Sequence, residues 1–190
     1  MSSTFASSFA DAASLLEEAR SDHGLMADLE TLADWLTDAF RDGKKALACG
    51  NGGSLADAMH FAEEWTGRFR NERDPYPVMA LSDPTHLTCT ANDYGYDHVF
   101  ERNVRAFGQP GDILFLLSTS GNSKNLVLAA EAARAKQVRT VGFLGKGGGA
   151  LASECDLAIV FPGATSDRIQ ELHMLTLHAL IETVEARLVV

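Results

Sequence analysis

Two hydrophobic patterns alternate along most of this chain, and their alternation restricts the folds that it can adopt. Five short apolar runs follow residue 43 and cover residues 46–49, 78–81, 113–117, 140–144 and 157–161. Stretches with the helical period lie between them, notably over residues 55–69, 99–107 and 125–135. Continuous apolar runs are typical of strands buried on both faces. The alternation therefore predicts an α/β fold, a three-layer sandwich with a five-stranded parallel sheet.

Further helical patterns flank this α/β core. Two amphipathic stretches open the chain, with Gly24 between them, and their apolar positions are Phe5, Phe9, Ala12 and Leu16, then Leu25, Leu29, Leu32, Leu36 and Phe40. A last helix is expected over about residues 167–188. We find no internal repeat, low-complexity tract or linker. The 190 residues are therefore predicted to form a single domain over 1–190, with N-terminal helices over 1–43, the α/β core over 44–165 and a C-terminal helix over 166–190.

Composition excludes several classes of function. Lys and Arg number 16 against 26 Asp and Glu, and the formal charge of -10 repels polyanions, so we expect no nucleic-acid partner. No run approaches membrane-spanning length and no leader pattern opens the chain, so we expect no membrane association and a cytoplasmic protein. The three cysteines, Cys49, Cys89 and Cys155, lack a CxxC pair, which indicates packing thiols in a reducing compartment.

Two loops carry the residue types that bind phosphate. Glycine, Asn and hydroxyl residues follow the first and third apolar runs, over 50–54 (GNGGS) and 118–123 (STSGNS), and a helical pattern follows each loop. Glycines allow close backbone approach, and helix N-termini and hydroxyls supply donors to an anion. Neither loop fits a nucleotide-binding pattern, and the glycine run over 145–149 does not either. Each loop alone is also explained by turn and helix-cap chemistry; the two together favour a phosphate ligand.

Two helical segments contain side chains for proton transfer or metal binding. His60 and Glu64 are four residues apart and therefore share a helix face, with Arg68 one turn further, whereas Glu63 points to the neighbouring face. Such an imidazole and carboxylate can share a proton-transfer task or bind one metal ion, but spacing alone favours a surface network in which Glu64 pairs with His60 or Arg68. Gln170, His173 and His178 lie among apolar residues of the last helix, where a histidine more often belongs to the core.

Four segments of the chain together resemble one enzyme family. The segments GNGGSLADAMHFAEEWTGRFR, ANDYGYDHVF, STSGNSKN and DRIQELHMLTLH, in this order and spacing, resemble the phosphoheptose isomerases of the SIS (sugar isomerase) superfamily. The resemblance runs over nearly the whole chain and implies a single SIS domain. It also implies that sedoheptulose 7-phosphate is isomerised to D-glycero-D-manno-heptose 7-phosphate through an enediolate. This aldose–ketose step is the first toward the ADP-heptose of bacterial lipopolysaccharide.

The same resemblance implies a role for individual residues. It assigns catalysis to Glu64 and His178. It implies one zinc ion per active site with the ligands His60, Glu64, Gln170 and His178. The substrate-binding residues that it implies are Asn51, Gly52, Gly53, Ser54, Glu64, Asn92, Asp93, Ser118, Thr119, Ser120, Ser123 and Gln170. Glu64 is the expected base and His178 the expected acid, because a carboxylate is readily tuned upward in a desolvated cleft.

Helix geometry and the apolar stripes bear on assembly. Gln170 and His178 are eight residues apart, which is about 12 Å of helical rise, so one ion reaches both only if the helix bends or if different subunits supply them. The stripes of the terminal helices also need burial that a sheet with two covered faces does not provide. We therefore expect a homotetramer, the assembly of the family, with active sites between subunits.

Two other functions fit part of the sequence. A non-catalytic SIS module that binds a replication-initiation partner has the same fold, but such a module is expected to lose groups such as His178 and the intact GNGGS loop, which this chain retains. The second alternative is an isomerase of another phosphosugar, and nothing in the sequence rules out a heptose destined for a different glycan or for an antibiotic.

Overall fold

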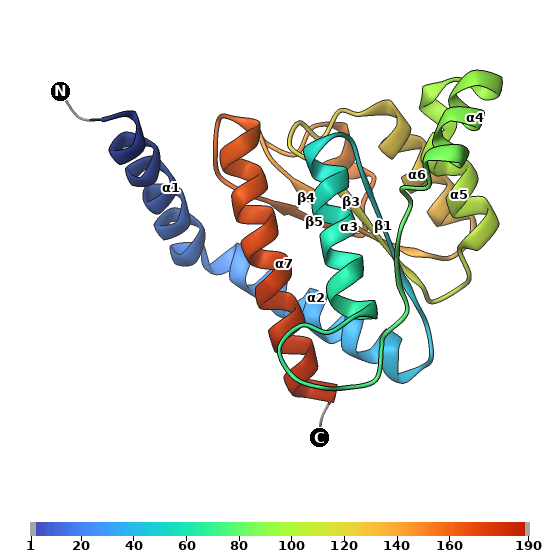
Figure 1. Cartoon of the computed structure of the whole chain (residues 1–190), viewed down its shortest axis with the longest axis horizontal. Coiled ribbons are helices and arrows are strands. Elements are labelled where there is room, and N and C mark those ends of the chain that lie inside the picture. The colour runs from blue at the N-terminus through green and yellow to red at the C-terminus, as the bar shows by residue number, and fades with distance from the viewer. Residues whose placement is uncertain (1–2, 189–190) are drawn as a thin grey trace.

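The computed structural model describes residues 3–188 as one α/β fold (Figure 1). Residues 1–2 and 189–190 of the predicted domain lie outside the described residues. In chain order the elements are α1 (Thr4–Ser21), α2 (His23–Arg41), β1 (Ala46–Gly50), α3 (Gly53–Thr66), β2 (Val78–Ala80), α4 (Pro84–Tyr94), the 3₁₀ turn η1 (Tyr96–His98), α5 (Val99–Phe107), β3 (Ile113–Ser118), α6 (Lys124–Ala135), β4 (Arg139–Leu144), the 3₁₀ turn η2 (Ala150–Ser153), β5 (Leu157–Val160) and α7 (Ser166–Leu188).

All five strands form one parallel sheet in the order β2-β1-β3-β4-β5. This confirms the predicted fold class. The chain moves to one side of β1 to form β2 and then to its other side to form β3. Loops at the carboxyl ends of β1 and β3 therefore diverge at this switch point, which is where open α/β sheets bind ligands.

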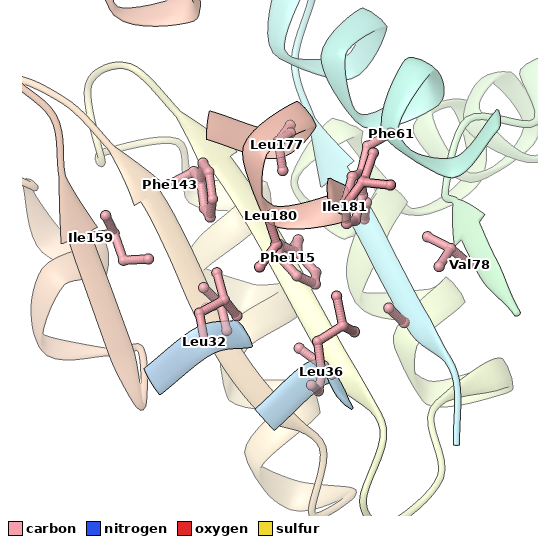
Figure 2. Close-up of a cluster of buried hydrophobic side chains, with 14 of the residues drawn as sticks. Leu32, Leu36, Phe61, Val78, Phe115, Phe143, Ile159, Leu177, Leu180 and Ile181 are labelled. Carbon is pink, nitrogen blue, oxygen red and sulfur yellow. The ribbon is translucent and has the colours of Figure 1, made fainter. Parts of the chain in front are cut away.

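Two hydrophobic cores, one on each face of the sheet, explain why the strands are apolar throughout. Ala46 and Ala48 of β1 face the core built by α2, α3 and α7, whereas the alternate residues Leu47 and Cys49 face the core built by α5 and α6. Figure 2 shows the first core, where Leu32 and Leu36 of α2, Phe61 of α3 and Leu177, Leu180 and Ile181 of α7 converge on strand residues such as Phe115 and Phe143. The sheet is thus the middle of three layers.

The two N-terminal helices differ in how much they bury. The break between them falls at Asp22, which caps α2 by accepting from the backbone N–H groups of Gly24 and Leu25. Gly24 was predicted to separate the two helices, but it lies in the first turn of α2. α2 and α7 pack their apolar sides into the core on one face of the sheet, so the expectation that their stripes need burial beyond this sheet is wrong. α1 projects from the body (Figure 1), and its Phe5 and Phe9 are 78% and 73% exposed.

α4 is an element that periodicity did not predict. Its sequence, PTHLTCTANDY, is rich in polar and β-branched residues, and only Thr90 is buried. The start is nonetheless encoded locally, because Asp83 accepts from the backbone N–H of His86 and Pro84 occupies the first turn. Among residues 3–188, no helix is both long and apolar enough to cross a membrane.

Candidate active site

The loops that follow β1 and β3 meet at the switch point of the sheet. Gly52 has φ of +56°, a conformation that side chains disfavour, and it begins the turn into α3. The amide of Asn51 donates to Asn125 Oδ1 at 3.0 Å, and the amide of Asn125 donates back to Asn51 Oδ1 at 2.9 Å. Asn125 is buried in the first turn of α6, so this reciprocal pair fixes one loop against the other. The hydroxyl of Tyr96 also donates to Asn51 Oδ1, at 2.9 Å.

The loop after β3 is folded around its own hydroxyl groups. The Ser118 hydroxyl accepts from the Gly121 N–H at 3.0 Å, and the Ser120 hydroxyl accepts from the Asn122 N–H at 3.2 Å. Ser123 precedes α6 as its N-cap residue, but its side chain makes no capping bond. Thr119 Oγ1 lies 2.9 Å from the hydroxyl of Ser166, where α7 begins. The predicted phosphate-binding residues thus surround the N-terminus of a twelve-residue helix.

The glycine run over 145–149 supports this loop, a role that the sequence did not reveal. Gly121 has φ of +64°, and a Cβ atom placed there would lie 1.8 Å from the carbonyl oxygen of Gly148. The Leu151 N–H donates to the Gly121 carbonyl at 2.9 Å, and the Ala150 N–H donates to Asn122 Oδ1 at 3.0 Å. Two glycine-rich backbones therefore pack directly against each other, and the loop after β4 holds the loop after β3 in shape.

His60, Glu64 and His178 form a three-residue cluster on α3 and α7, further from the loops at the sheet edge. The two helices run side by side (Figure 1). His60 Nε2 is 3.1 Å from Glu64 Oε1, and ligand atoms of His60, Glu64 and His178 all lie within 4.8 Å of one another. The side chain of His60 is 44% exposed and that of Glu64 16% exposed. Arg68 does not join this cluster, because its nearest acidic partner is Glu72 at 4.0 Å. The structure thus brings three predicted residues together within one chain.

Gln170 lies elsewhere, beside the first turn of α3. Its amide donates to the Ser54 hydroxyl at 3.3 Å and occupies the space next to Gly53. α7 runs without interruption from Ser166 to Leu188, so Gln170 lies about 12 Å of helical rise from His178. α7 therefore has no break between Gln170 and His178. Gln170 of the same chain belongs with the loops at the sheet edge rather than with the three-residue cluster.

Three other predicted or candidate residues are placed as follows. Asn92 and Asp93 are exposed at the C-terminal end of α4, with the Asn92 amide donating to Asp93 Oδ1 at 2.8 Å. His173 is fully buried between the rings of Phe143 and Phe161, and burial lowers its pKa to about 4 against an opposing contribution from the Leu144 carbonyl. His173 is therefore a core residue.

The three-residue cluster fits a catalytic zinc ion. Two imidazoles and one carboxylate are a common ligand set for catalytic zinc, and three protein ligands leave a position for substrate. Asp57, one turn before His60 on α3, adds a further carboxyl group nearby. Burial raises its pKa to about 6, against the opposing effect of His60. The cluster can therefore also exchange protons, as a half-buried carboxylate beside imidazoles does.

Comparison with known proteins places the chain in a family. A family model described as the SIS domain matches residues 8–145. The phosphoheptose isomerase of Fusobacterium nucleatum is 54% identical over 158 residues, which is 83% of this chain and 81% of that protein. That of Vibrio cholerae is 49% identical over 180 residues, 94% of each chain. The solved phosphoheptose isomerase of Neisseria gonorrhoeae superposes with a TM-score of 0.90 at 37% identity, over 96% of this chain and 97% of that one. The chain thus belongs to the phosphoheptose isomerase family of SIS-domain proteins.

Proposed function

We propose that the protein converts sedoheptulose 7-phosphate to D-glycero-D-manno-heptose 7-phosphate, in the cytoplasm, as the first step toward ADP-heptose. The observation that carries this proposal is the cluster of His60, Glu64 and His178, whose ligand atoms lie within 4.8 Å of one another in a member of the phosphoheptose isomerase family. An isomerase needs groups that move protons between adjacent carbon and oxygen atoms, and this cluster supplies them. The cysteines, all free thiols in the structure, suit a reducing compartment.

The loop at 118–123 is the proposed phosphate site. Backbone N–H groups at the start of α6 and the hydroxyls of Ser118, Thr119, Ser120 and Ser123 supply neutral donors, which suffice for one phosphate despite the acidic net charge. Asn51 and the backbone at Gly52 and Gly53 line the neighbouring edge, where sugar hydroxyls would bind. The proposed substrate-binding set is completed by Ser54, Glu64, Asn92, Asp93 and Gln170.

Glu64 and His178 are proposed to carry the proton transfers. The Glu64 carboxylate removes a proton from C1 of the open-chain ketose, the resulting enediolate keeps the electron pair over C1 and C2, and Glu64 returns the proton to C2. His178 donates a proton to the oxygen on C2 and takes back the proton that the C1 hydroxyl loses as it becomes the aldehyde oxygen, so that both groups return to their starting states. The position of Glu64 favours this role, because its side chain is only 16% exposed and lies in one cluster with His60 and His178.

His60, Glu64 and His178 would also hold the proposed zinc ion, one per active site. Zinc bound there would polarise the carbonyl and hydroxyl oxygens of the substrate. The remaining predicted ligand, Gln170, would have to come from another subunit, because Gln170 of the same chain lies about two helical turns away. Zinc analysis of protein purified without chelator, followed by the activity of the chelated protein, tests this part of the proposal.

Distances along α3 support an active site shared between subunits of a homotetramer. Glu64 is eleven residues beyond Gly53, which is about 16 Å of helical rise away from the loops at the sheet edge. An extended seven-carbon phosphate with C–C bonds of about 1.5 Å spans only about 10 Å from its reacting carbons to phosphorus. A substrate bound by the phosphate loop of one chain would therefore meet the cluster of another. The exposed stripe with Phe5 and Phe9 on α1 offers the apolar surface for such an assembly.

Turnover of sedoheptulose 7-phosphate by the purified protein is the decisive experiment. We expect aldose product, with kcat/KM higher than for ketose phosphates of five or six carbons. Equal or better turnover of a shorter ketose phosphate would assign the protein to another phosphosugar. No turnover of any of these compounds, in the presence of zinc, would contradict the proposal.

A further inference from the structure

The irregular segment between α3 and β2, residues 67–77, contacts both helices of the three-residue cluster. In Figure 1 it leaves the lower end of α3, crosses α7 near its C-terminal end and returns toward the sheet. The backbone of Tyr76 donates to the Trp65 carbonyl at 3.1 Å, and that of Ala46 donates to the Pro77 carbonyl at 3.0 Å. The segment is therefore attached at its end to α3 and to the sheet.

Arg73 is the buried anchor of this segment. Its Nη2 donates to the Glu64 carbonyl at 2.8 Å and its Nη1 to the Trp65 carbonyl at 2.8 Å, so the guanidinium binds carbonyls in the last turns of α3. Its Nε donates to Glu185 Oε1 on α7 at 2.6 Å. The side chains of Arg73 and Glu185 are only 9% and 11% exposed. The rings of Trp65 and Tyr76 each lie 5.4 Å from the guanidinium carbon.

These bonds connect the backbone of one proposed catalytic residue to the helix that carries the other. Glu64 itself supplies one of the carbonyls. Glu185 follows His178 by seven residues, two helical turns, and so lies on nearly the same face of α7. The same segment reaches His178 directly, because the Phe69 ring stacks on the imidazole with centroids 5.7 Å apart and an interplanar angle of 27°.

A planar donor group suits this connection better than other side chains. Arginine offers five N–H donors in a fixed fork, so one side chain can hold two carbonyls and a carboxylate in a set relation. A buried ion pair contributes little net stability compared with apolar packing, and in some proteins it serves instead to specify one arrangement. Here the arrangement that it specifies is the spacing of α3 and α7 at the three-residue cluster.

We propose that Arg73 is a positioning residue that fixes Glu64 and His178 relative to each other, by binding the Glu64 carbonyl and Glu185 together. The proposal rests on the proposed function of Glu64 and His178. The guanidinium of Arg73 bonds the backbone of Glu64 and the side chain of Glu185, and none of the three side chains of the cluster. Arg73 therefore acts through the backbone of α3 and through α7.

The test compares Arg73→Met with a control at a more exposed arginine, Arg134→Met, whose side chain is 62% exposed. Arg134 also donates to a carboxylate and a carbonyl, both of Glu154, but on α6. For Arg73→Met we expect kcat with sedoheptulose 7-phosphate to fall about 10- to 100-fold, with KM within about threefold, because the loops that bind the phosphate are unchanged. The zinc affinity of metal-free protein, measured by competition with a chromophoric chelator, should fall about tenfold or more. Arg134→Met should change neither quantity.

Melting curves separate positioning from stability. A structural role alone would lower the melting temperature of Arg73→Met and leave the kcat and zinc affinity of the folded protein unchanged, and that result would overturn the proposal. If Arg73→Met does not fold, Arg73→Lys keeps the charge beside Glu185 but loses the fork, and it should show smaller losses of kcat and zinc affinity. Wild-type kcat and affinity in folded Arg73→Lys would also overturn it. If the wild-type protein does not turn over the heptose phosphate, the proposed function fails, and zinc affinity still tests Arg73.

Discussion

Mixing two inactive variants should restore activity if the active site is shared between chains. Ser120→Asp keeps an acceptor for the Asn122 N–H but places a negative charge where the phosphate is expected, and Coulomb repulsion should abolish substrate binding. Glu64→Gln removes the proposed base and leaves the loop intact. After subunit exchange, a site that takes its loop from one chain and its cluster from another has both wild-type parts in about a quarter of cases. We therefore expect about 25% of wild-type turnover from the mixture, against almost none from either variant alone.

The structure also supplies the control for this experiment. Glu64 and His178 lie in one cluster of one chain, so a mixture of Glu64→Gln with His178→Ala should regain no activity. Native mass spectrometry of tagged and untagged chains shows whether subunits exchanged. Exchange without recovery in the first mixture would refute the shared site, and recovery in the control mixture would refute the cluster within one chain. A monomer in light scattering would refute the assembly altogether.

The remaining predictions concern single residues. Glu64→Gln should lower kcat by about a hundredfold or more, whereas Glu63→Gln, on the exposed neighbouring face, should leave kcat unchanged. Steady-state kinetics measures both, and a near-normal kcat in Glu64→Gln would exclude Glu64 as the base. Ser123→Ala should weaken binding by about 1–2 kcal/mol, seen as a higher KM with little change in kcat, and an unchanged KM would place the phosphate elsewhere. Burial lowers the pKa of His173 to about 4, so between pH 6.5 and 4 only the unfolded chain takes up this proton. The free energy of unfolding therefore decreases as the pH is lowered through this range. When the wild-type protein goes from pH 7 to pH 5, its free energy of unfolding should fall, and His173→Leu should remove about 2 kcal/mol of that decrease, as measured by urea unfolding. An equal pH dependence of the free energy of unfolding in both proteins would contradict the assignment of His173 as a buried neutral residue.

The fold was largely predictable because its strands are buried on both faces. A run such as Ile113–Ser118 is apolar at nearly every position, and few other structures accommodate such a run in a chain of mixed composition. α4 was missed because only one of its residues is buried, so hydrophobic periodicity could not indicate it. The signal that was present, Asp83 followed by Pro84, marks a helix start only after a helix is suspected.

The candidate site was only partly predictable, for a different reason. Local chemistry identified the two loops and the face shared by His60 and Glu64. The meeting of His178 with that face depends on how α3 and α7 pack, and no local pattern specifies packing between elements more than a hundred residues apart. Arg73 was missed because it lies in an irregular segment without periodicity, where its partners are distant carbonyls and a carboxylate. Asn125 and Tyr96 lie in segments that the family resemblance covers, but their bonds to Asn51 could not be inferred from the sequence.

Two levels of contact between α3 and α7 explain how one pair of helices can serve two parts of an active site. At the upper level the Gln170 amide fits beside Gly53, where the missing side chain leaves room, and bonds to Ser54. At the lower level His178 meets His60, with ring centroids 5.1 Å apart. Both helices run away from the sheet edge, so the rise between the two levels is about 9 Å along α3 and about 12 Å along α7. Contacts at both ends of such an interval fix the register of the helices. The same contacts that align Gln170 with the loops therefore also align His178 with Glu64.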